Sequence, residues 1–374
     1  MRKLIPILLA LWVSVPFAGA QADDGAPAPA TIPFDMSTGR PVVDVLINGE
    51  GPYPFIFDTG SPLLVIIGDL RDELTLEPTG TRMIGSPAGD MALEADTTTI
   101  HSLTLGAVEL SDTDATLLDM PGFPASAGRG VIGPALFRDF GSVTIDFSSQ
   151  TITIGGQPDL PPGTHWMPID PQSLHLNADV RIGVVVIPGH IDTGAPGILS
   201  VPASYQDIIP LTGPLTSVGR ARLVDAEFEI FGAPIDLPVR VGNLDLSVDQ
   251  IVFGQIPVAN IGNRGLIGSQ IHYDWTNMQF ALTRTGAEMV RQPPPARFGL
   301  GAYPLDGDGI LVVRSTQAGS PAEASGLQAD DRIMAINGVL PGELGMAEIR
   351  SAFGVRPLEM TIERAGEALT LTLP

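Results

Sequence analysis

The chain has 374 residues, a formal net charge of −22 at pH 7 and no cysteine. The absence of cysteine excludes cysteine nucleophiles. The single lysine is Lys3, so the rest of the chain has no Schiff-base lysine, Ser-Lys pair or phosphate-loop lysine. The excess of negative charge argues against nucleic acid and anionic membrane surfaces as partners, because both repel an acidic protein.

The first 20 residues have the order of a secretory signal peptide. Positive charge at Arg2 and Lys3 precedes an apolar run over 4–17, which ends in the small residues Ala18-Gly-Ala20. The apolar run is shorter than the roughly 20 residues that a spanning helix needs. We therefore predict export to the periplasm or the extracellular space, with residues 1–20 removed and no stable membrane span afterwards.

The next segments are predicted to be mostly β structure. An Ala/Pro tract makes 21–39 a flexible lead-in. From Arg40 onward, short β-branched runs alternate with Gly, Pro and Asp, which predicts an all-β fold class with a few short helices. These runs lie at 42–47, 55–57, 63–67, 143–147 and 151–154. A Pro-rich segment at 287–297 has the composition of a linker and separates a C-terminal module from the rest.

The region before this linker contains an internal repeat. The segment Phe55-Ile-Phe-Asp58-Thr-Gly-Ser-Pro62 matches Gly189-His-Ile-Asp192-Thr-Gly-Ala-Pro196, and Arg129-Gly-Val-Ile-Gly133 matches Arg264-Gly-Leu-Ile-Gly268. From the aspartate to the last glycine there are 75 residues in the first copy and 76 in the second. A local turn explains one Asp-Thr-Gly triplet but not this paired register. We predict two duplicated lobes, 40–160 and 161–286.

Each Ile-Gly is expected to lead into a short helix and then a strand. In the first copy these are predicted at 134–140 and 143–147, and in the second copy at 269–275 and 278–283.

These motifs resemble the retropepsin-like branch of the aspartic peptidases, in which each of two lobes contributes one Asp-Thr-Gly loop. The resemblance covers roughly residues 31–286 and implies the acid-protease fold with a cleft between the lobes. It implies a catalytic pair, hydroxyls that tie the two loops together, and glycines that let the backbone pass close to both carboxylates. The catalytic pair is Asp58 and Asp192. The hydroxyls are those of Thr59 and Thr193, and the glycines are Gly60 and Gly194. The segments expected to thread beside the loops end in Ile132-Gly133 and Ile267-Gly268.

A pair of neighbouring carboxylates also accounts for hydrolysis of a peptide bond by water, independently of any family. Two carboxyl groups a few ångströms apart cannot both ionise, so they share one proton and supply a base for water and an acid for the departing amine. The pair titrates as a unit. We expect no cofactor and no metal, because the five histidines show no metal-ligand spacing.

The residue after each triplet makes the two loops unequal. Ser61 has a hydroxyl that can donate to Asp58 and favour its ionised form, whereas Ala195 has no such donor. From this difference we expect a mildly acidic activity optimum. His190 lies two positions before Asp192 and should point to the same face of a strand. It is either a residue that tunes the pair or an incidental neighbour.

A hairpin lid over the pair is predicted in the first lobe. The segment 84–89, with Gly85 and Gly89, has the composition of a hairpin turn, and 219–223 is a weaker counterpart in the second lobe. An ordinary surface hairpin is the alternative.

Residues 298–374 resemble a bacterial PDZ domain over essentially their whole length. The resemblance rests on Ser320-Pro-Ala, Gly326-Leu327 and the run from Asp330 to Gly338. It implies that a peptide C-terminus adds as a strand beside a carboxylate-binding loop. That loop is Gly299, Leu300 and Gly301. Since Ala302 replaces a usually bulky residue, a structural or docking module without a peptide ligand is the alternative.

The sequence thus predicts an exported aspartic endopeptidase that acts on peptide or protein substrates, with a PDZ domain that binds peptide C-termini or serves for docking. One alternative is a non-catalytic peptide-binding protein that keeps the same cleft. Another is an active site that forms only when lobes from two chains pair.

Overall fold

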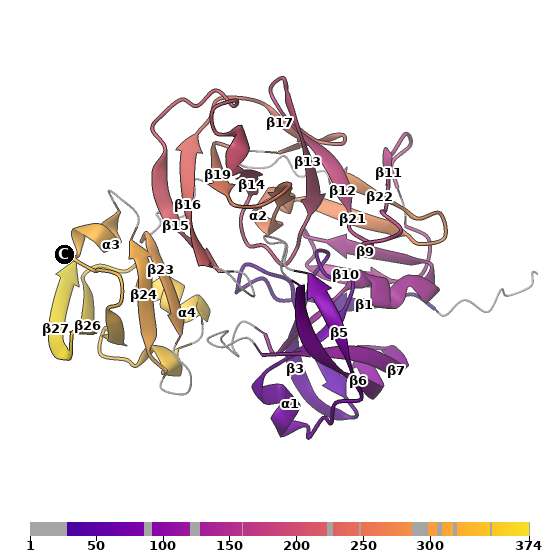
Figure 1. Ribbon diagram of the computed structural model, residues 1–374, viewed down its shortest axis with the longest axis horizontal. Coiled ribbons are helices and arrows are strands. Elements are labelled where there is room, and N and C mark those ends of the chain that lie inside the picture. The colour runs from indigo at the N-terminus through magenta and orange to yellow at the C-terminus, as the bar shows by residue number, and fades with distance from the viewer. Residues whose placement is uncertain are drawn as a thin grey trace, which may run out of the picture.

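The computed structural model describes residues 28–85, 92–119, 128–158, 160–222, 227–246, 248–285, 298–304, 309–316, 320–344 and 346–373. The predicted signal peptide and the Pro-rich linker lie outside these residues. The described chain forms two β-rich lobes and a C-terminal module (Figure 1). None of its helices has the length and apolarity needed to cross a membrane.

The first lobe is built on a seven-stranded sheet with the order β2-β3-β8-β4-β7-β6-β5. Apolar and polar residues alternate along β2, so Val43, Val45 and Ile47 enter the core while Asp44 faces solvent. The strands are β2 (Val42–Ile47), β3 (Glu50–Phe57), β4 (Leu64–Ile67), β5 (Gly80–Gly85), β6 (Ala92–Leu105), β7 (Val108–Leu118) and β8 (Gly130–Ile132). The helix α1 (Asp69–Glu73) follows β4, and the 3-10 helix η2 (Pro134–Phe140) follows β8.

The second lobe repeats this topology. Its nine-stranded sheet contains the order β12-β13-β20-β14-β19-β16-β15, which matches the first lobe strand for strand, and β17 and β18 extend it beyond β12. The strands are β12 (Asn177–Ile182), β13 (Val185–Ile191), β14 (Leu199–Pro202), β15 (Thr216–Arg222), β16 (Glu227–Pro234), β17 (Val239–Val241), β18 (Leu244–Leu246), β19 (Gln250–Gly254) and β20 (Ala259–Ile261). The helix α2 (Asn263–Leu266) follows β20, and the 3-10 helix η3 (Ala203–Tyr205) follows β14. The predicted duplication within a mostly β fold is confirmed.

A third sheet of six strands, in the order β1-β10-β9-β21-β22-β11, joins the lobes. Its centre is the antiparallel pair β9–β21, one strand from each lobe, with Ile145 opposite Ile271. The strands are β1 (Ala30–Pro33), β9 (Ser142–Asp146), β10 (Thr151–Ile154), β11 (Trp166–Pro168), β21 (Ser269–Asp274) and β22 (Gln279–Arg284). One apolar core therefore runs through both lobes.

Two local predictions are wrong. The described part of the lead-in is ordered, because β1 pairs with β10 and buries Ile32 and Phe34 in the core. Residues 269–274 form strand β21 rather than a helix, since pairing on both sides with β9 and β22 satisfies their backbone groups. The helix of the second lobe lies upstream of this strand, as α2.

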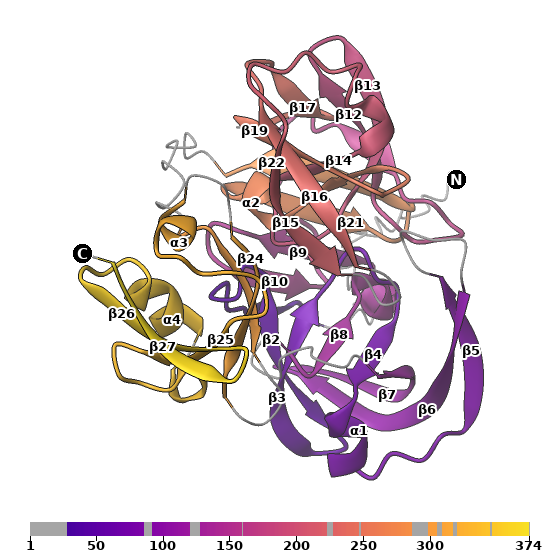
Figure 2. The ribbon, with the colours of Figure 1, turned by 60° about the vertical axis from the view of Figure 1, so that its left-hand side comes forward.

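The C-terminal module has a core of its own and a five-stranded sheet in the order β23-β24-β25-β26-β27 (Figure 2). Its strands are β23 (Leu300–Pro304), β24 (Leu311–Thr316), β25 (Arg332–Ile336), β26 (Leu358–Arg364) and β27 (Glu367–Leu373), and its helices are α3 (Pro321–Ala324), the 3-10 turn η4 (Pro341–Glu343) and α4 (Met346–Ala352). Ser320 caps α3 by accepting from the amide of Glu323. Strand β24 lies beside β15 of the second lobe.

Candidate active site

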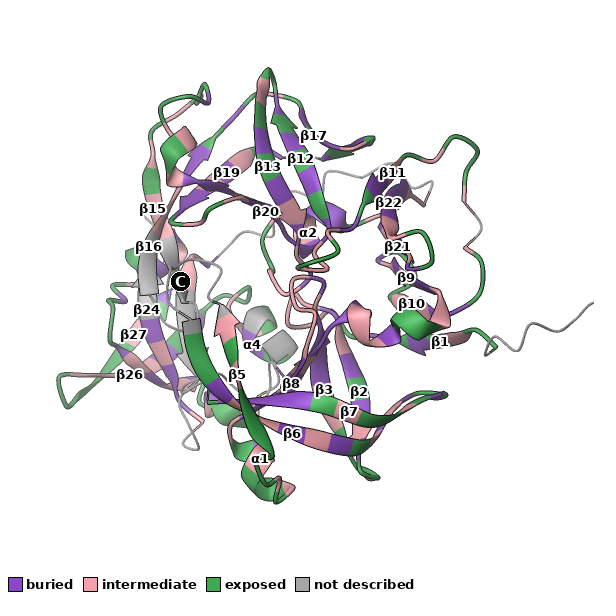
Figure 3. Ribbon diagram, turned by 45° about the vertical axis from the view of Figure 1, so that its right-hand side comes forward, coloured by how far each residue is buried: buried purple, intermediate pink, exposed green. Residues whose placement is uncertain are grey.

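The two aspartates follow equivalent strands and lie at the junction of the lobes. Asp58 comes directly after β3 and Asp192 directly after β13, and these strand ends approach each other (Figure 3). The amide of Asp58 donates to the Ile132 carbonyl at 3.0 Å, and that of Asp192 donates to the Ile261 carbonyl at 2.9 Å. Each aspartate is therefore fixed by the strand that runs parallel to its own, β8 or β20.

Thr59 and Thr193 join the two loops through four buried hydrogen bonds. Each threonine amide donates to the other threonine's hydroxyl, at 2.9 Å and 3.0 Å. The Thr59 hydroxyl donates to the Ile191 carbonyl at 2.8 Å, and the Thr193 hydroxyl donates to the Phe57 carbonyl at 2.6 Å. Because every donor crosses from one lobe to the other within the same chain, this network sets the distance between the aspartates.

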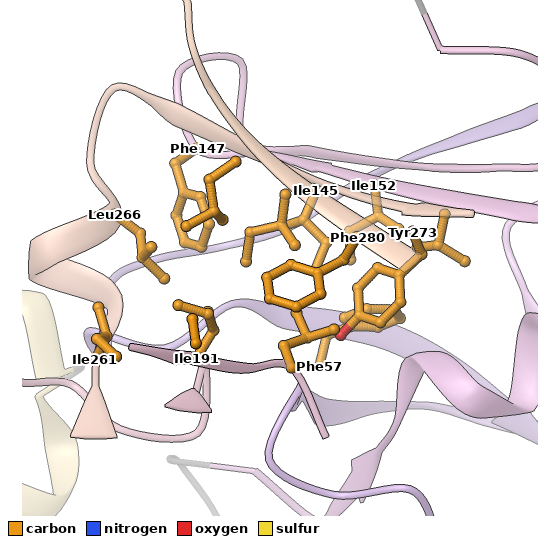
Figure 4. Close-up of a cluster of buried hydrophobic side chains, with 14 of the residues drawn as sticks. Phe57, Ile145, Phe147, Ile152, Ile191, Ile261, Leu266, Tyr273 and Phe280 are labelled. Carbon is orange, nitrogen blue, oxygen red and sulfur yellow. The ribbon is translucent and has the colours of Figure 1, made fainter. Parts of the chain in front are cut away.

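The floor beneath these loops is apolar. Phe57 and Ile191, which directly precede the two aspartates, pack among side chains of the six-stranded sheet that include Tyr273 and Phe280 (Figure 4). Burial raises the pKa of the Tyr273 phenol well above its ordinary value, so this group stays neutral below the pair. Such a floor excludes water from one side of the carboxyls and strengthens their interaction.

Gly60 and Gly194 lie directly against the carboxyl groups. A Cβ atom at Gly60 would come within 2.9 Å of Asp192 Oδ1, and one at Gly194 within 2.5 Å of Asp58 Oδ2. Both glycine amides donate to Asp58 Oδ1, at 2.8 Å and 3.0 Å. The two carboxyls are within hydrogen-bond reach of each other.

The pKa values of the two carboxyls are shifted in opposite directions. Burial, and then the negative charge of Asp192, raise the pKa of Asp58 to about 8. Burial also disfavours the charge on Asp192, but contacts with His190 and Asn260 outweigh it and lower the pKa of Asp192 below its ordinary value. At neutral pH the pair therefore holds one proton and one negative charge, and the opposite pKa shifts favour the proton on Asp58.

Two residues of the second lobe stabilise the Asp192 charge. Asn260 Nδ2 donates to Asp192 Oδ2 at 2.5 Å, and His190 Nε2 lies 3.9 Å from the same oxygen, an ion-pair distance. The ring of His175 lies 5.9 Å from the ring of His190. Burial, followed by the neighbouring His190, lowers the pKa of His175.

The expected role of Ser61 is wrong. Ser61 Oγ accepts from the Leu63 amide at 3.3 Å, and the hydrogen bonds described for the site include none between this hydroxyl and Asp58. The inequality of the pair thus has the opposite sense from the one expected, with Asp58 protonated. It arises from the second lobe rather than from the residues after the triplets, Ser61 and Ala195.

The segment that threads beside the second loop is also different from the predicted one. In the first lobe, Ile132-Gly133 lies there as expected, and Gly133 passes so close to the Ser61 carbonyl that no Cβ would fit. In the second lobe, Ile261-Gly262 takes this place, with a Cβ at Gly262 predicted 2.7 Å from the Ala195 carbonyl. Ile267 and Gly268 lie beyond α2, and Ile267 is 53% exposed.

Three supporting residues were not predicted from the sequence. Asn263 is fully buried and donates to the carbonyls of Gly39, Thr193 and Ala195. Arg40 Nε donates to the Gly194 carbonyl at 2.6 Å, across the lobes. Asn260 could have been found by matching Ala259-Asn-Ile-Gly262 to Gly130-Val-Ile-Gly133, but the 75- and 76-residue spacing favoured the wrong segment.

The other predicted site residues are the glycines of the candidate lid and the loop of the C-terminal module. Gly85 ends β5 in the first hairpin, while Gly89 lies outside the described residues. Gly299 has a φ of 78°, Leu300 packs against the core of the C-terminal module, and Gly301 lies in β23 at the edge of its sheet. The described chain holds no group of three or more His, Asp or Glu residues arranged to bind a metal ion.

Comparison with known proteins agrees with this geometry. The chain matches the aspartyl protease family over residues 43–135 and the PDZ domain family over residues 312–364. A search of curated proteins finds no match. The first match covers the loop of Asp58 and its partner segment, and the second lobe repeats the same strand order around Asp192. The chain therefore has the architecture of a retropepsin-like aspartyl protease with two lobes, followed by a PDZ domain.

Proposed function

We propose that this protein is an aspartic endopeptidase that hydrolyses peptide bonds with a water molecule activated between Asp58 and Asp192. The observation that carries the proposal is the placement of two buried carboxyls side by side by the Thr59 and Thr193 hydrogen bonds between the lobes. Two carboxyls within hydrogen-bond reach have opposite pKa shifts, so a base and an acid are both present at neutral pH.

In the first step the Asp192 carboxylate takes a proton from water, and the water oxygen bonds to the carbonyl carbon of the peptide. Asp58 gives its proton to the carbonyl oxygen, which forms a tetrahedral diol. In the second step the proton on Asp192 passes to the amide nitrogen and the C–N bond breaks. Asp58 recovers a proton from one hydroxyl, so both carboxyls return to their starting states.

The test is hydrolysis of a proteome-derived peptide library, with pepstatin inhibition as a second readout. Asp58→Asn and Asp192→Asn should each lower kcat/KM by about three orders of magnitude or more, because the acid and base act as one unit. Asp112→Asn, at a largely exposed aspartate on β7, is the matched control and should leave activity unchanged. Equal cleavage by wild type and Asp58→Asn would refute the mechanism. Peptide binding without cleavage would instead favour a non-catalytic peptide-binding protein.

The C-terminal module is proposed to bind peptide C-termini. Its strand β23 is at the edge of the sheet, so its outer backbone groups can pair with an added peptide strand beside the loop of Gly299 to Gly301. A library of fluorescent C-terminal peptides tests this proposal, and binding that survives amidation of the peptide C-terminus would contradict it.

Export is proposed from the N-terminal sequence. Expression of the full chain in a bacterial host, followed by N-terminal sequencing of the processed protein, should give a mature terminus near Gln21. A product that keeps Met1 or its neighbours would contradict export by a cleaved signal.

A further inference from the structure

The two lobes differ chemically at one pair of equivalent positions beside their aspartates. In the first lobe, Ile56 of β3 is opposite Val131 of β8. In the second lobe, the same positions are His190 of β13 and Asn260 of β20. In both lobes the first residue of the pair is two positions before the aspartate. An apolar pair has therefore been replaced by a polar one on the Asp192 side only.

This replacement gives Asp192 one hydrogen-bond donor and one imidazole at ion-pair distance, both from side chains of its own lobe. Asn260 Nδ2 is 2.5 Å from Asp192 Oδ2, and His190 Nε2 is 3.9 Å from that oxygen. The side chains of His190 and Asp192 are 16% and 17% exposed, so solvent screens the interaction only partly. Ile56 and Val131 have no group that can interact with a charge on Asp58.

The backbone acts in the other direction but more weakly. Two neutral amides, of Gly60 and Gly194, donate to Asp58 Oδ1 and favour its ionised form. Both reach the same oxygen and leave Oδ2 able to carry a proton. On the other side, Asn260 Nδ2 donates to Asp192 Oδ2 and His190 Nε2 lies at ion-pair distance, and the pKa of Asp192 is lowered while that of Asp58 stays raised.

The surroundings contain few other titratable groups. His175 faces His190 and also lies within reach of the Gly60 backbone, and Asp170 in turn interacts with His175. Tyr273 lies on the other side of Asp58 and stays neutral because it is buried. Arg40, whose Nε donates to the Gly194 carbonyl at 2.6 Å, adds a permanent positive charge beside the loops.

We propose that His190 and Asn260 are positioning residues that hold Asp192 as the ionised, water-activating member of the pair and leave Asp58 as the proton donor. This inference rests on the proposed peptidase function. It adds that the two aspartates have fixed and different roles, although their Asp-Thr-Gly triplets are identical. The second lobe assigns those roles through side chains that do not contact the substrate.

The test is to give the second lobe the residues of the first. In His190→Ile and Asn260→Val the acid limb of the kcat/KM profile should move upward by about one pH unit each, since a hydrogen bond to a charged group contributes on that order. Activity on the alkaline side of this limb should stay within about threefold of wild type, because Asp192 is ionised there in the variant as well as in the wild type. His190→Gln, which keeps a donor without the charge, should give a smaller shift.

His101→Gln is the matched control, because His101 is a largely exposed histidine on β6 and should leave the profile unchanged. An acid limb that does not move in either variant would overturn the proposal. So would an equal loss of activity at every pH, which indicates a purely structural role.

A second readout does not depend on turnover. In protein with 13C-labelled aspartate carboxyls, the resonances of the pair are assigned by their loss in Asp58→Asn and Asp192→Asn. The lower of the two apparent pKa values should rise in His190→Ile and Asn260→Val. A wild type that cleaves nothing would refute the proposed function alone, whereas an unchanged lower pKa would refute this inference alone.

Discussion

At the scale of residues, the site depends on which groups surround each carboxyl. Asp58 receives two backbone amides from the glycines of the two triplets, while Asp192 receives a side-chain amide and lies next to an imidazole. Burial disfavours charge on both aspartates, so the better-supported one ionises first and its charge then keeps the proton on the other. The identical triplets thus produce an acid and a base.

Asp58 is predicted to make the stability of the protein depend on pH. Its pKa is raised to about 8 in the folded chain, against about 3.9 for an unfolded aspartate. Between these values the folded state keeps a proton that the unfolded state releases, so the free energy of unfolding should fall as pH rises from about 4 to about 8. The lowered pKa of Asp192 acts in the opposite direction, but below this range.

Asp58→Asn cannot ionise and should therefore gain thermal stability relative to wild type as the pH is raised. Thermal unfolding of the two proteins at pH 5 and pH 8 measures this, with Asp112→Asn as the control. The same difference in Tm at both pH values would contradict the raised pKa.

At the scale of elements, each aspartate loop is held between its own strand and the segment that threads beside it. Gly133 passes the Ser61 carbonyl after β8, and Gly262 passes the Ala195 carbonyl after β20. At both places backbone packs directly against backbone, so there is no room for a side chain. The glycine requirement comes from close approach and not from an unusual φ, since neither residue is in the left-handed region.

Gly262→Ala is predicted to destabilise the second lobe by about 1–3 kcal/mol, the usual cost of forcing extra atoms into a packed site. It should also lower activity, because the Ala195 carbonyl belongs to the loop of Asp192. Gly197→Ala is the matched control, as a Cβ at Gly197 meets nothing within 4 Å. Urea unfolding of both variants measures the difference. Equal stability of the two would mean that Ile261-Gly262 does not thread beside the loop.

At the scale of the whole molecule, the two lobes form one packed unit and the C-terminal module forms another. The six-stranded sheet and a continuous apolar core connect the lobes, while the module has a separate core. Within that module, the carboxylate of Asp331 is 1% exposed and accepts two hydrogen bonds from Arg364, at 2.6 Å and 2.7 Å.

Arg364→Ala is therefore predicted to destabilise the C-terminal module by about 3–5 kcal/mol, because it leaves a buried carboxylate without its charged partner and with only the Gln328 amide among its described donors. In a calorimetric scan one transition should move to lower temperature while the transition of the lobes stays in place. Arg356→Ala is the control, because the described hydrogen bonds of this arginine go to backbone carbonyls and its other contact is with the Phe298 ring, 6.0 Å away, so no buried charge loses its partner. A shift of both transitions would show that the two cores unfold together.

The sequence alone determined the features that depend on local pattern. Short alternating runs between Gly, Pro and Asp specify β structure, and the two Asp-Thr-Gly triplets at strand ends identify the aspartates and the duplication. The motifs of the C-terminal module likewise lie within a continuous stretch that folds around its own core.

Only the tertiary structure decided which distant segments lie beside the loops. Two Ile-Gly pairs follow the second triplet, and equal spacing favoured Ile267-Gly268, but the parallel pairing of β13 with β20 places Ile261-Gly262 there. The same pairing brings Asn260 next to His190 and so makes the aspartates unequal. Strand partners are chosen by packing across the whole lobe, and the chemical difference between Asp58 and Asp192 is a consequence of that choice.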